Sequence, residues 1–142
     1  MNPEIKVMRS YYPSGALWFE TEVNRQGQRD GVSLEYHENG KPKCQSSWRN
    51  MVFDGVFKQW RDDGVLLGEF VITAGNGVFK HWHDNGQLGL ETEYRKGAKH
   101  GVSRVYDPLN GKCILTQYFL SGRKVPKKKY IEEMAKMDQA AN

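Results

Sequence analysis

The dipeptide Gly-Val recurs at a nearly fixed interval, and this periodicity constrains the fold more than any other feature of the chain. Its copies begin at Gly31, Gly55, Gly77 and Gly101, at spacings of 24, 22 and 24 residues. An aromatic residue stands five positions after each Gly, and a turn ending in Gly follows, as in HENG, RDDG and HDNG. Asn-Gly and Asp-Gly between strand-like runs favour β-hairpins, because type I′ turns require positive φ. The sequence therefore predicts tandem hairpin units.

The segments that follow the turns alternate between apolar and polar residues with a period of two. In the fourth unit Leu88, Leu90 and Tyr94 alternate with polar positions such as Glu91. The same pattern holds in five units, the first of which contains the turn that ends at Gly15. Such alternation is typical of strands with one apolar and one polar face. We expect an all-β fold, an elongated single-layer twisted antiparallel β-meander of about ten strands. The expected units are residues 5–30, 31–54, 55–76, 77–100 and 101–122.

Residues 123–142 depart from the repeat and form a basic tail. The tail holds six Lys and Arg residues against Glu132, Glu133 and Asp138, a net charge of +3 that leaves +1 for the preceding residues. Pro126 introduces a segment with Ile131, Met134 and Ala135 at helical spacing, which predicts a short C-terminal helix over 127–139. This helix either caps the last strand edge or contacts a partner or lipid.

Composition and charge exclude several classes of protein. Aromatic residues make up 12% of the chain, which is too many for a disordered segment. The near-neutral body gives no reason to expect a nucleic-acid partner. Cys44 and Cys113 form no CxxC or Cys/His pattern, so neither a metal nor a cofactor is expected. The N-terminal segment lacks the apolar core of a signal peptide, and the expected location is cytoplasmic.

The repeat units resemble a known family. The segments GVFKQWRDDGVLLGEF, GVFKHWHDNGQLGLETEYRKGAKHG and GVSLEYHENGKPK are similar to the bacterial variant of the MORN repeat, as found in YwqK-type antitoxin proteins. The likeness extends over residues 9–122. It is broken where Met51 replaces a connector Gly, where the connector at 74–76 is shortened, and where 106–111 carries an extra residue. The resemblance implies MORN-type hairpins whose extended sheet is an interaction surface, in an antitoxin-like, immunity-type or scaffold protein.

Two groups of residues resemble catalytic or metal-binding sites. His81 and His83 flank Trp82, but the other units lack this pair, so ordinary surface histidines are favoured over a metal site. Glu20, Glu69 and Glu91 occupy equivalent polar positions in their units. A regular row on a polar face lacks the unlike environments that separate the pKa values of an acid and a base. We therefore expect a protein that is not an enzyme.

A stripe of aromatic residues and cations on the first strand of the units is the candidate binding site. Its members are Tyr36, Trp60, Trp82, Tyr106, Lys58, Lys80 and Arg104. One interpretation is structural, because cross-strand aromatic pairs stabilise thin sheets. The other is a surface on which rings and cations engage a partner. Both interpretations are compatible with the spacing.

The sequence thus predicts a non-enzymatic protein-binding repeat module whose partner is a protein, with a toxin as one candidate. An alternative is a peripheral protein that binds anionic lipid through Lys127–Lys129 and the terminal helix, although three Lys are fewer than a dedicated lipid patch carries. Another alternative is self-association into a homo-oligomer through strand edges or the aromatic face.

Overall fold

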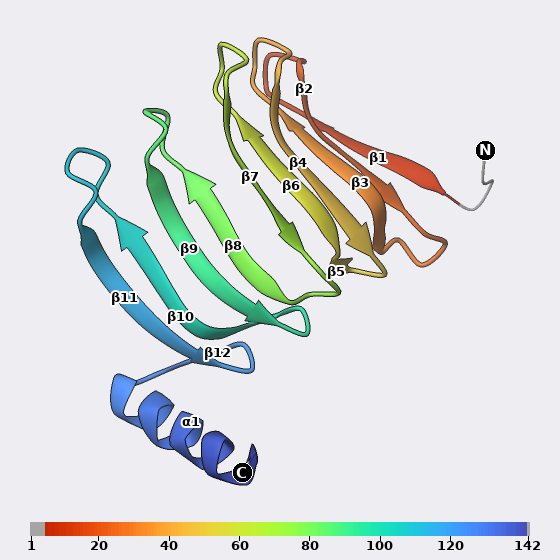
Figure 1. Cartoon of the computed structure of the whole chain (residues 1–142). Helices are drawn as coiled ribbons and strands as arrows, with labels where there is room; N and C mark the ends of the chain where they lie inside the picture. The colour runs from red at the N-terminus through yellow and green to blue at the C-terminus, as the bar shows by residue number, and fades with distance from the viewer. Residues whose placement is uncertain (1–4, 142) are drawn as a thin grey trace.

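The computed structural model describes residues 5–141 and consists of antiparallel strands that follow one another in chain order, with one helix after them (Figure 1). The elements are β1 (Lys6–Tyr11), β2 (Leu17–Val23), β3 (Arg29–Tyr36), β4 (Pro42–Arg49), β5 (Val52–Phe53), β6 (Gly55–Trp60), β7 (Leu66–Ile72), β8 (Gly77–Trp82), β9 (Leu88–Arg95), β10 (Ala98–Tyr106), β11 (Cys113–Leu120), β12 (Arg123–Val125) and α1 (Lys127–Ala141). The predicted all-β meander with a short C-terminal helix is confirmed. The two strands beyond the predicted ten are the short strands β5 and β12.

In the second and fifth units, the Gly of the Gly-Val dipeptide has a structural cause in a carboxylate that crosses the backbone. Gly101 has φ of +120°, and a Cβ there would overlap the side chain of Glu93. The Glu93 carboxylate accepts a hydrogen bond of 2.5 Å from the backbone N–H of Val102. Glu22 does the same for the N–H of Val32, at 3.0 Å, beside Gly31. Glycine is therefore required where the side chain replaces a strand partner.

Side chains in the loops bind each unit to the next. At the tight turns, the Asn39 amide donates to the carbonyl of Asp62 at 2.8 Å, and the Asn85 amide donates to that of Pro108 at 2.6 Å. At the opposite ends, the Asp54 carboxylate accepts the N–H of Ala74 and the Asn76 amide oxygen accepts that of Lys96. These bonds satisfy loop backbone groups that strand pairing leaves free.

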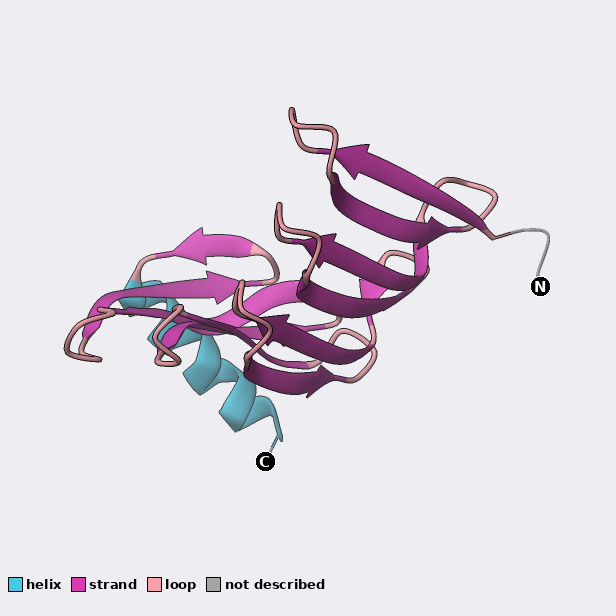
Figure 2. Ribbon diagram, turned by 90° about the horizontal axis from the view of Figure 1, so that it is seen from above, coloured by secondary structure: helices cyan, strands magenta, loops and turns pink. Residues whose placement is uncertain are grey.

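The meander is divided into two sheets between β7 and β8. The first sheet has the order β1-β2-β3-β4-β6-β7 with β5 on β4, and the second has the order β12-β11-β10-β9-β8. At the boundary an isolated bridge joins Thr73 and Asn76. Figure 2 shows the two sheets meeting at an angle, so that each has an inner face turned toward the other sheet and an outer face.

A buried glutamine forms two hydrogen bonds between the two sheets where strand pairing stops. Gln59 of β6 is 3% exposed, and its amide donates to the carbonyl of Trp82 at 2.8 Å and accepts the Trp82 N–H at 2.9 Å. The Trp82 ring lies against Gly68 of β7, where a Cβ would fall 2.2 Å from a ring carbon. Gly68 thus provides the space in which the tryptophan fills the junction.

The core of the protein is a cluster of aromatic rings on the inner faces at this junction. Phe57 is buried, and its ring centroid lies 4.8 Å from Phe70 and 5.3 Å from Phe79. To either side, the inner faces carry buried hydroxyl pairs, with Thr21 bonded to Ser33 and Thr92 bonded to Ser103. The apolar contacts are therefore concentrated where the two sheets meet.

The C-terminal helix lies on the outer face of the second sheet. The ring of Tyr130 in α1 packs 5.2 Å from that of Tyr118 in β11, and Tyr118 pairs with Val102 on the face opposite the buried Ser103. Figure 2 shows α1 on the outside of the angle between the sheets. No helix in residues 5–141 is long and apolar enough to cross a membrane.

Replacing Gln59 with leucine will weaken the junction between the sheets. Gln59→Leu keeps the side-chain volume but leaves the N–H and carbonyl of Trp82 unpaired, so we expect it to lower the free energy of unfolding by roughly 2–4 kcal/mol. Gln87→Leu, at an exposed turn position, is the control and should change it by less than about 0.5 kcal/mol. Urea denaturation monitored by tryptophan fluorescence gives both values. Equal stability of the two variants would show that Gln59 does not connect the sheets.

Candidate binding groove

Two adjoining hollows on the inner faces form one groove, which we call the binding groove. One is an apolar pocket and the other a polar hollow, and both are lined by Ser46, Phe57 and Phe79. The shared residues come from β4 and β6 of the first sheet and β8 of the second. The groove therefore exists because the two sheets meet at an angle.

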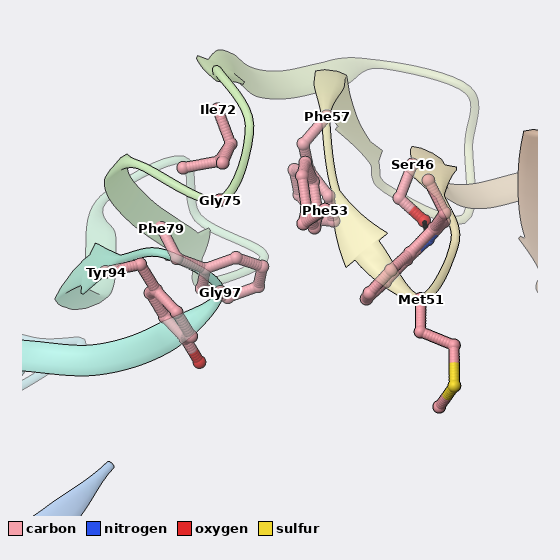
Figure 3. Close-up of a pocket in the computed structure, with 10 residues that line it drawn as sticks. Ser46, Met51, Phe53, Phe57, Ile72, Gly75, Phe79, Tyr94 and Gly97 are labelled. Carbon is pink, nitrogen blue, oxygen red and sulfur yellow. Dashed lines mark hydrogen bonds between the residues drawn. The ribbon is translucent and has the colours of Figure 1, made fainter. Parts of the chain in front are cut away.

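The apolar pocket has a volume of about 200 Å³ and contains most of the ring surface of the groove. Its lining comprises Ser46, Trp48, Met51, Phe53, Phe57, Ile72, Gly75, Phe79, Tyr94 and Gly97. Figure 3 shows Phe53 and Phe57 on one side and Phe79 and Tyr94 on the other. The Phe53 ring lies 5.1 Å from Trp48 and 6.4 Å from Phe79, so it extends the core cluster to the pocket. A pocket of this size and lining suits an apolar side chain.

The irregular connectors of the repeat build this pocket. Met51 stands where other units have a connector Gly, has φ of +69°, and is 60% exposed at the rim. In the shortened connector the N–H of Gly75 donates to the carbonyl of Phe53 at 2.9 Å, and the carbonyl of Gly75 accepts the N–H of Gly97 at 3.1 Å. Two of the departures noted in the sequence pattern therefore coincide with the pocket.

The polar hollow continues the groove toward the tight turns and has a volume of about 260 Å³. It is lined by Phe19, Arg29, Ser33, Glu35, Cys44, Ser46, Phe57, Phe79 and His81. The Glu35 carboxylate accepts a hydrogen bond from the Trp18 indole at 3.3 Å and lies 3.8 Å from the ammonium of Lys43. The Trp18 indole and the Lys43 ammonium therefore offset the negative charge of Glu35.

Burial disfavours the charged forms of two titratable groups in this hollow. Burial raises the pKa of the Cys44 thiol to about 12, and the nearby carboxylate of Glu35 contributes to this rise. Cys44 is therefore not a thiolate nucleophile near neutral pH. His81 is open to solvent on one side, yet its surroundings exclude enough water to lower its pKa, and Lys43 lowers it further. Within residues 5–141, no three His, Cys, Asp or Glu side chains are grouped to hold a metal ion. These groups favour recognition over chemistry.

The aromatic residues of the predicted stripe have individual partners. The Tyr36 hydroxyl donates to Glu20 at 2.7 Å, and the Tyr106 hydroxyl donates to Glu91 at 2.5 Å. Burial and the bond to Glu20 raise the pKa of Tyr36 to about 12, and the bond to Glu91 followed by burial does the same for Tyr106. Trp60 is half-buried, as is Trp82 over Gly68.

The three cations of the stripe lie opposite or beside carboxylates. Lys58 pairs in register with Glu69, and Lys80 pairs with Glu91. The Arg104 guanidinium lies 3.7 Å from the Glu91 carboxylate. The row of glutamates and the stripe therefore share the outer face, and their charges offset one another.

The two histidines noted in the sequence have separate surroundings. The imidazole of His83 is hydrogen-bonded to the carbonyl of Tyr106 at 2.9 Å, which joins the fourth unit to the fifth. His37 makes the equivalent contact to Trp60 at 3.0 Å. His81 instead lines the groove.

The groove residues Phe57, Phe79 and Arg29 were absent from the candidate site derived from sequence. A signal for the two phenylalanines was present, because both follow Gly-Val in the segment GVFK, where the second and fifth units have Ser33 and Ser103. Arg29 precedes the Gly-Val of the second unit and belonged to no pattern in the sequence.

Comparison with known proteins supports the repeat assignment. Residues 29–50 and 76–96 match the family model described as the MORN repeat variant. These segments contain the hairpins β3–β4 and β8–β9, so each of the two sheets includes one hairpin that is similar to the MORN repeat variant. Neither a curated protein nor a solved structure matches the chain significantly.

The paired tyrosines predict a loss of stability at alkaline pH. A pKa raised from about 10 to about 12 stabilises the folded state fully below pH 10, and this contribution is lost as the pH rises toward 12. The difference in unfolding free energy between the native protein and a Tyr36→Phe/Tyr106→Phe variant should therefore shrink over that interval. Tyr11→Phe, at an exposed position, is the control and should show no such trend. A difference that stays constant in urea unfolding from pH 9 to pH 12 would contradict the tyrosine–glutamate bonds.

Proposed function

We propose that this protein is a non-enzymatic protein-binding module that holds a segment of a partner protein in the binding groove. The observation that carries the proposal is the apolar pocket, which is ringed by aromatic residues and has the 60% exposed Met51 at its rim. MORN-type repeats commonly mediate binding, which agrees with this role.

The lining of the groove has the character of a protein interface. Buried aromatic residues surrounded by polar groups supply most of the energy in such interfaces. Here the apolar pocket offers Trp48, Phe53 and Phe79 to one anchoring side chain, and the polar hollow offers Arg29 and His81 beside it. The two hollows adjoin, so a partner segment that fills one also reaches the other.

The proposal covers two roles: the protein could sequester its partner, or it could assemble with its partner as a scaffold. In an antitoxin- or immunity-type role the groove would hold and block a toxic protein, and in a scaffold role it would fix a partner in place. The resemblance to YwqK-type proteins supports the former. Both roles require the same groove.

The outer-face stripe is proposed as a second contact surface. Arg104 is exposed, and Lys58, Lys80, Tyr36, Trp60 and Tyr106 are half-buried, whereas the Trp82 ring packs into the junction against Gly68 and Phe70. Their pairing with Glu20, Glu69 and Glu91 lowers the net charge of this face. We therefore rank it below the groove.

An exposed substitution at the rim tests the groove without disturbing the core. Peptides selected against the native protein from a displayed library should bind Met51→Asp at least tenfold more weakly, because an aspartate at the rim would be desolvated by an apolar anchor. Leu109→Asp introduces the same charge at a turn position that is 89% exposed, and it should leave the affinity within about twofold. Fluorescence anisotropy measures each affinity.

The result that contradicts the proposal is a set of selected peptides whose affinity does not depend on Met51. Peptides that lose affinity for Arg104→Gln instead would assign binding to the outer-face stripe. Unfolding curves of Met51→Asp and Leu109→Asp establish that both variants are folded.

A further inference from the structure

Charge is divided unequally between the two faces of the protein. Among the strand glutamates, Glu35 lies in the groove. The others lie on the outer face and are Glu20, Glu22, Glu69, Glu91 and Glu93. The groove side carries Arg29, Lys43 and Lys99. The inner face is therefore more positive than the net charge of the body suggests.

Arg29 is the most distinctive of these cations. Its guanidinium carbon lies 5.1 Å from the ring centroid of Phe19 and 5.0 Å from that of Trp48. Arg29 lines the polar hollow, and Trp48 lines the apolar pocket. The guanidinium is thus held by two rings where the two hollows adjoin.

Arg29 has no ion-pair partner among residues 5–141. Among the described residues, no carboxylate forms an ion pair with Arg29 and no acceptor takes a hydrogen bond from its side chain. By contrast, Arg9 pairs with Glu20 at 3.2 Å, and Arg61 pairs with Asp63 at 2.7 Å. Arg29 therefore lies over two rings with its N–H donors unused by the described residues.

The same arrangement recurs at the equivalent position of a later unit. Lys99, which like Arg29 stands two residues before the Gly of Gly-Val, has its ammonium 5.1 Å from the ring centroid of Phe119. No carboxylate pairs with Lys99 within residues 5–141. Phe53 occupies this position before the Gly-Val of the third unit and lines the apolar pocket. The position two residues before the Gly of Gly-Val therefore supplies a cation over a ring at Arg29 and again at Lys99. Between these two in the sequence, the same position supplies Phe53 to the apolar pocket.

The physical chemistry of a stacked guanidinium favours an anionic ligand. Stacking on rings fixes the plane of the group and leaves its edge free to donate two parallel hydrogen bonds to a carboxylate. Such charge-assisted, bidentate bonds are stronger than neutral ones, and less side-chain entropy is lost when the donor is already ordered.

We infer that the partner segment in the groove is acidic and places a carboxylate on Arg29 next to the apolar side chain that fills the pocket. The inference rests on the proposed function and specifies its partner chemically. A protein segment fits better than a nucleic acid, because the pocket offers few polar groups to base edges and the body outside residues 123–142 carries a net charge of only +1.

Synthetic probes of matched design test this inference. One labelled peptide alternates leucine with glutamate, a second alternates leucine with lysine, and a third probe is a labelled oligothymidylate of the same length. Binding to the full chain is measured by fluorescence anisotropy at fixed ionic strength. We expect the glutamate peptide to bind most tightly.

Variants that remove one positive charge from either face provide the control. Arg29→Gln should weaken binding of the glutamate peptide by on the order of tenfold, because a charge-assisted bond is lost. Arg29→Lys should restore only part of the affinity, since an ammonium cannot form the bidentate pair. Arg9→Gln changes the net charge equally on the outer face, at a cation that pairs with Glu20, and should leave binding within about twofold.

The inference is overturned if native protein does not prefer the glutamate peptide over the lysine peptide, or if Arg29→Gln binds it as tightly as the native protein does. Tighter binding of the oligothymidylate would assign the stacked cations to nucleic acid instead. If peptides selected against the native protein depend on Met51 but not on Arg29, the proposed function holds and the acidic partner is wrong.

Discussion

The interruption of strand pairing between β7 and β8 is the constraint on which the rest of the structure depends. A continuous meander would expose its inner face as one open surface. Here the backbone bonds stop, Gln59 supplies two bonds to Trp82 in their place, and the phenylalanine rings of both sheets come into contact. The angle between the sheets, the aromatic core and the groove all follow from this junction.

Much of the fold could be predicted because hairpin units are local. Turn residues and period-two alternation specify each pair of strands, and α1 begins at Lys127, as expected from Pro126. The junction could not be predicted in this way, because it depends on packing between Trp82 and Gly68, which are fourteen residues apart. The alternation along single strands also could not show that the stripe and the glutamates share a face. Which residues share a face depends on the register between strands, as in the pairing of Lys58 with Glu69.

The regular units and the irregular ones have different roles. The tight turns, which follow the regular pattern, repeat the same turn-to-turn hydrogen bonds and provide rigidity. The irregular connectors, with Met51 and the shortened segment at Gly75, open the apolar pocket in the middle of the array. A repeat scaffold of this kind orders its recognition residues before a partner arrives, which reduces the entropy lost on binding. The stacked Arg29 is the clearest example.

The central claim is that partners bind between the two sheets and not on the outer face. Amide chemical-shift mapping by NMR, with the native protein titrated with a selected peptide, tests it most directly. The account predicts that the largest shifts fall on β4, β5, β6 and β8, including Phe53, Phe57 and Phe79, with little change at the outer-face pairs such as Tyr106 and Glu91. Shifts that concentrate on the outer-face stripe while the groove residues stay unchanged would contradict it.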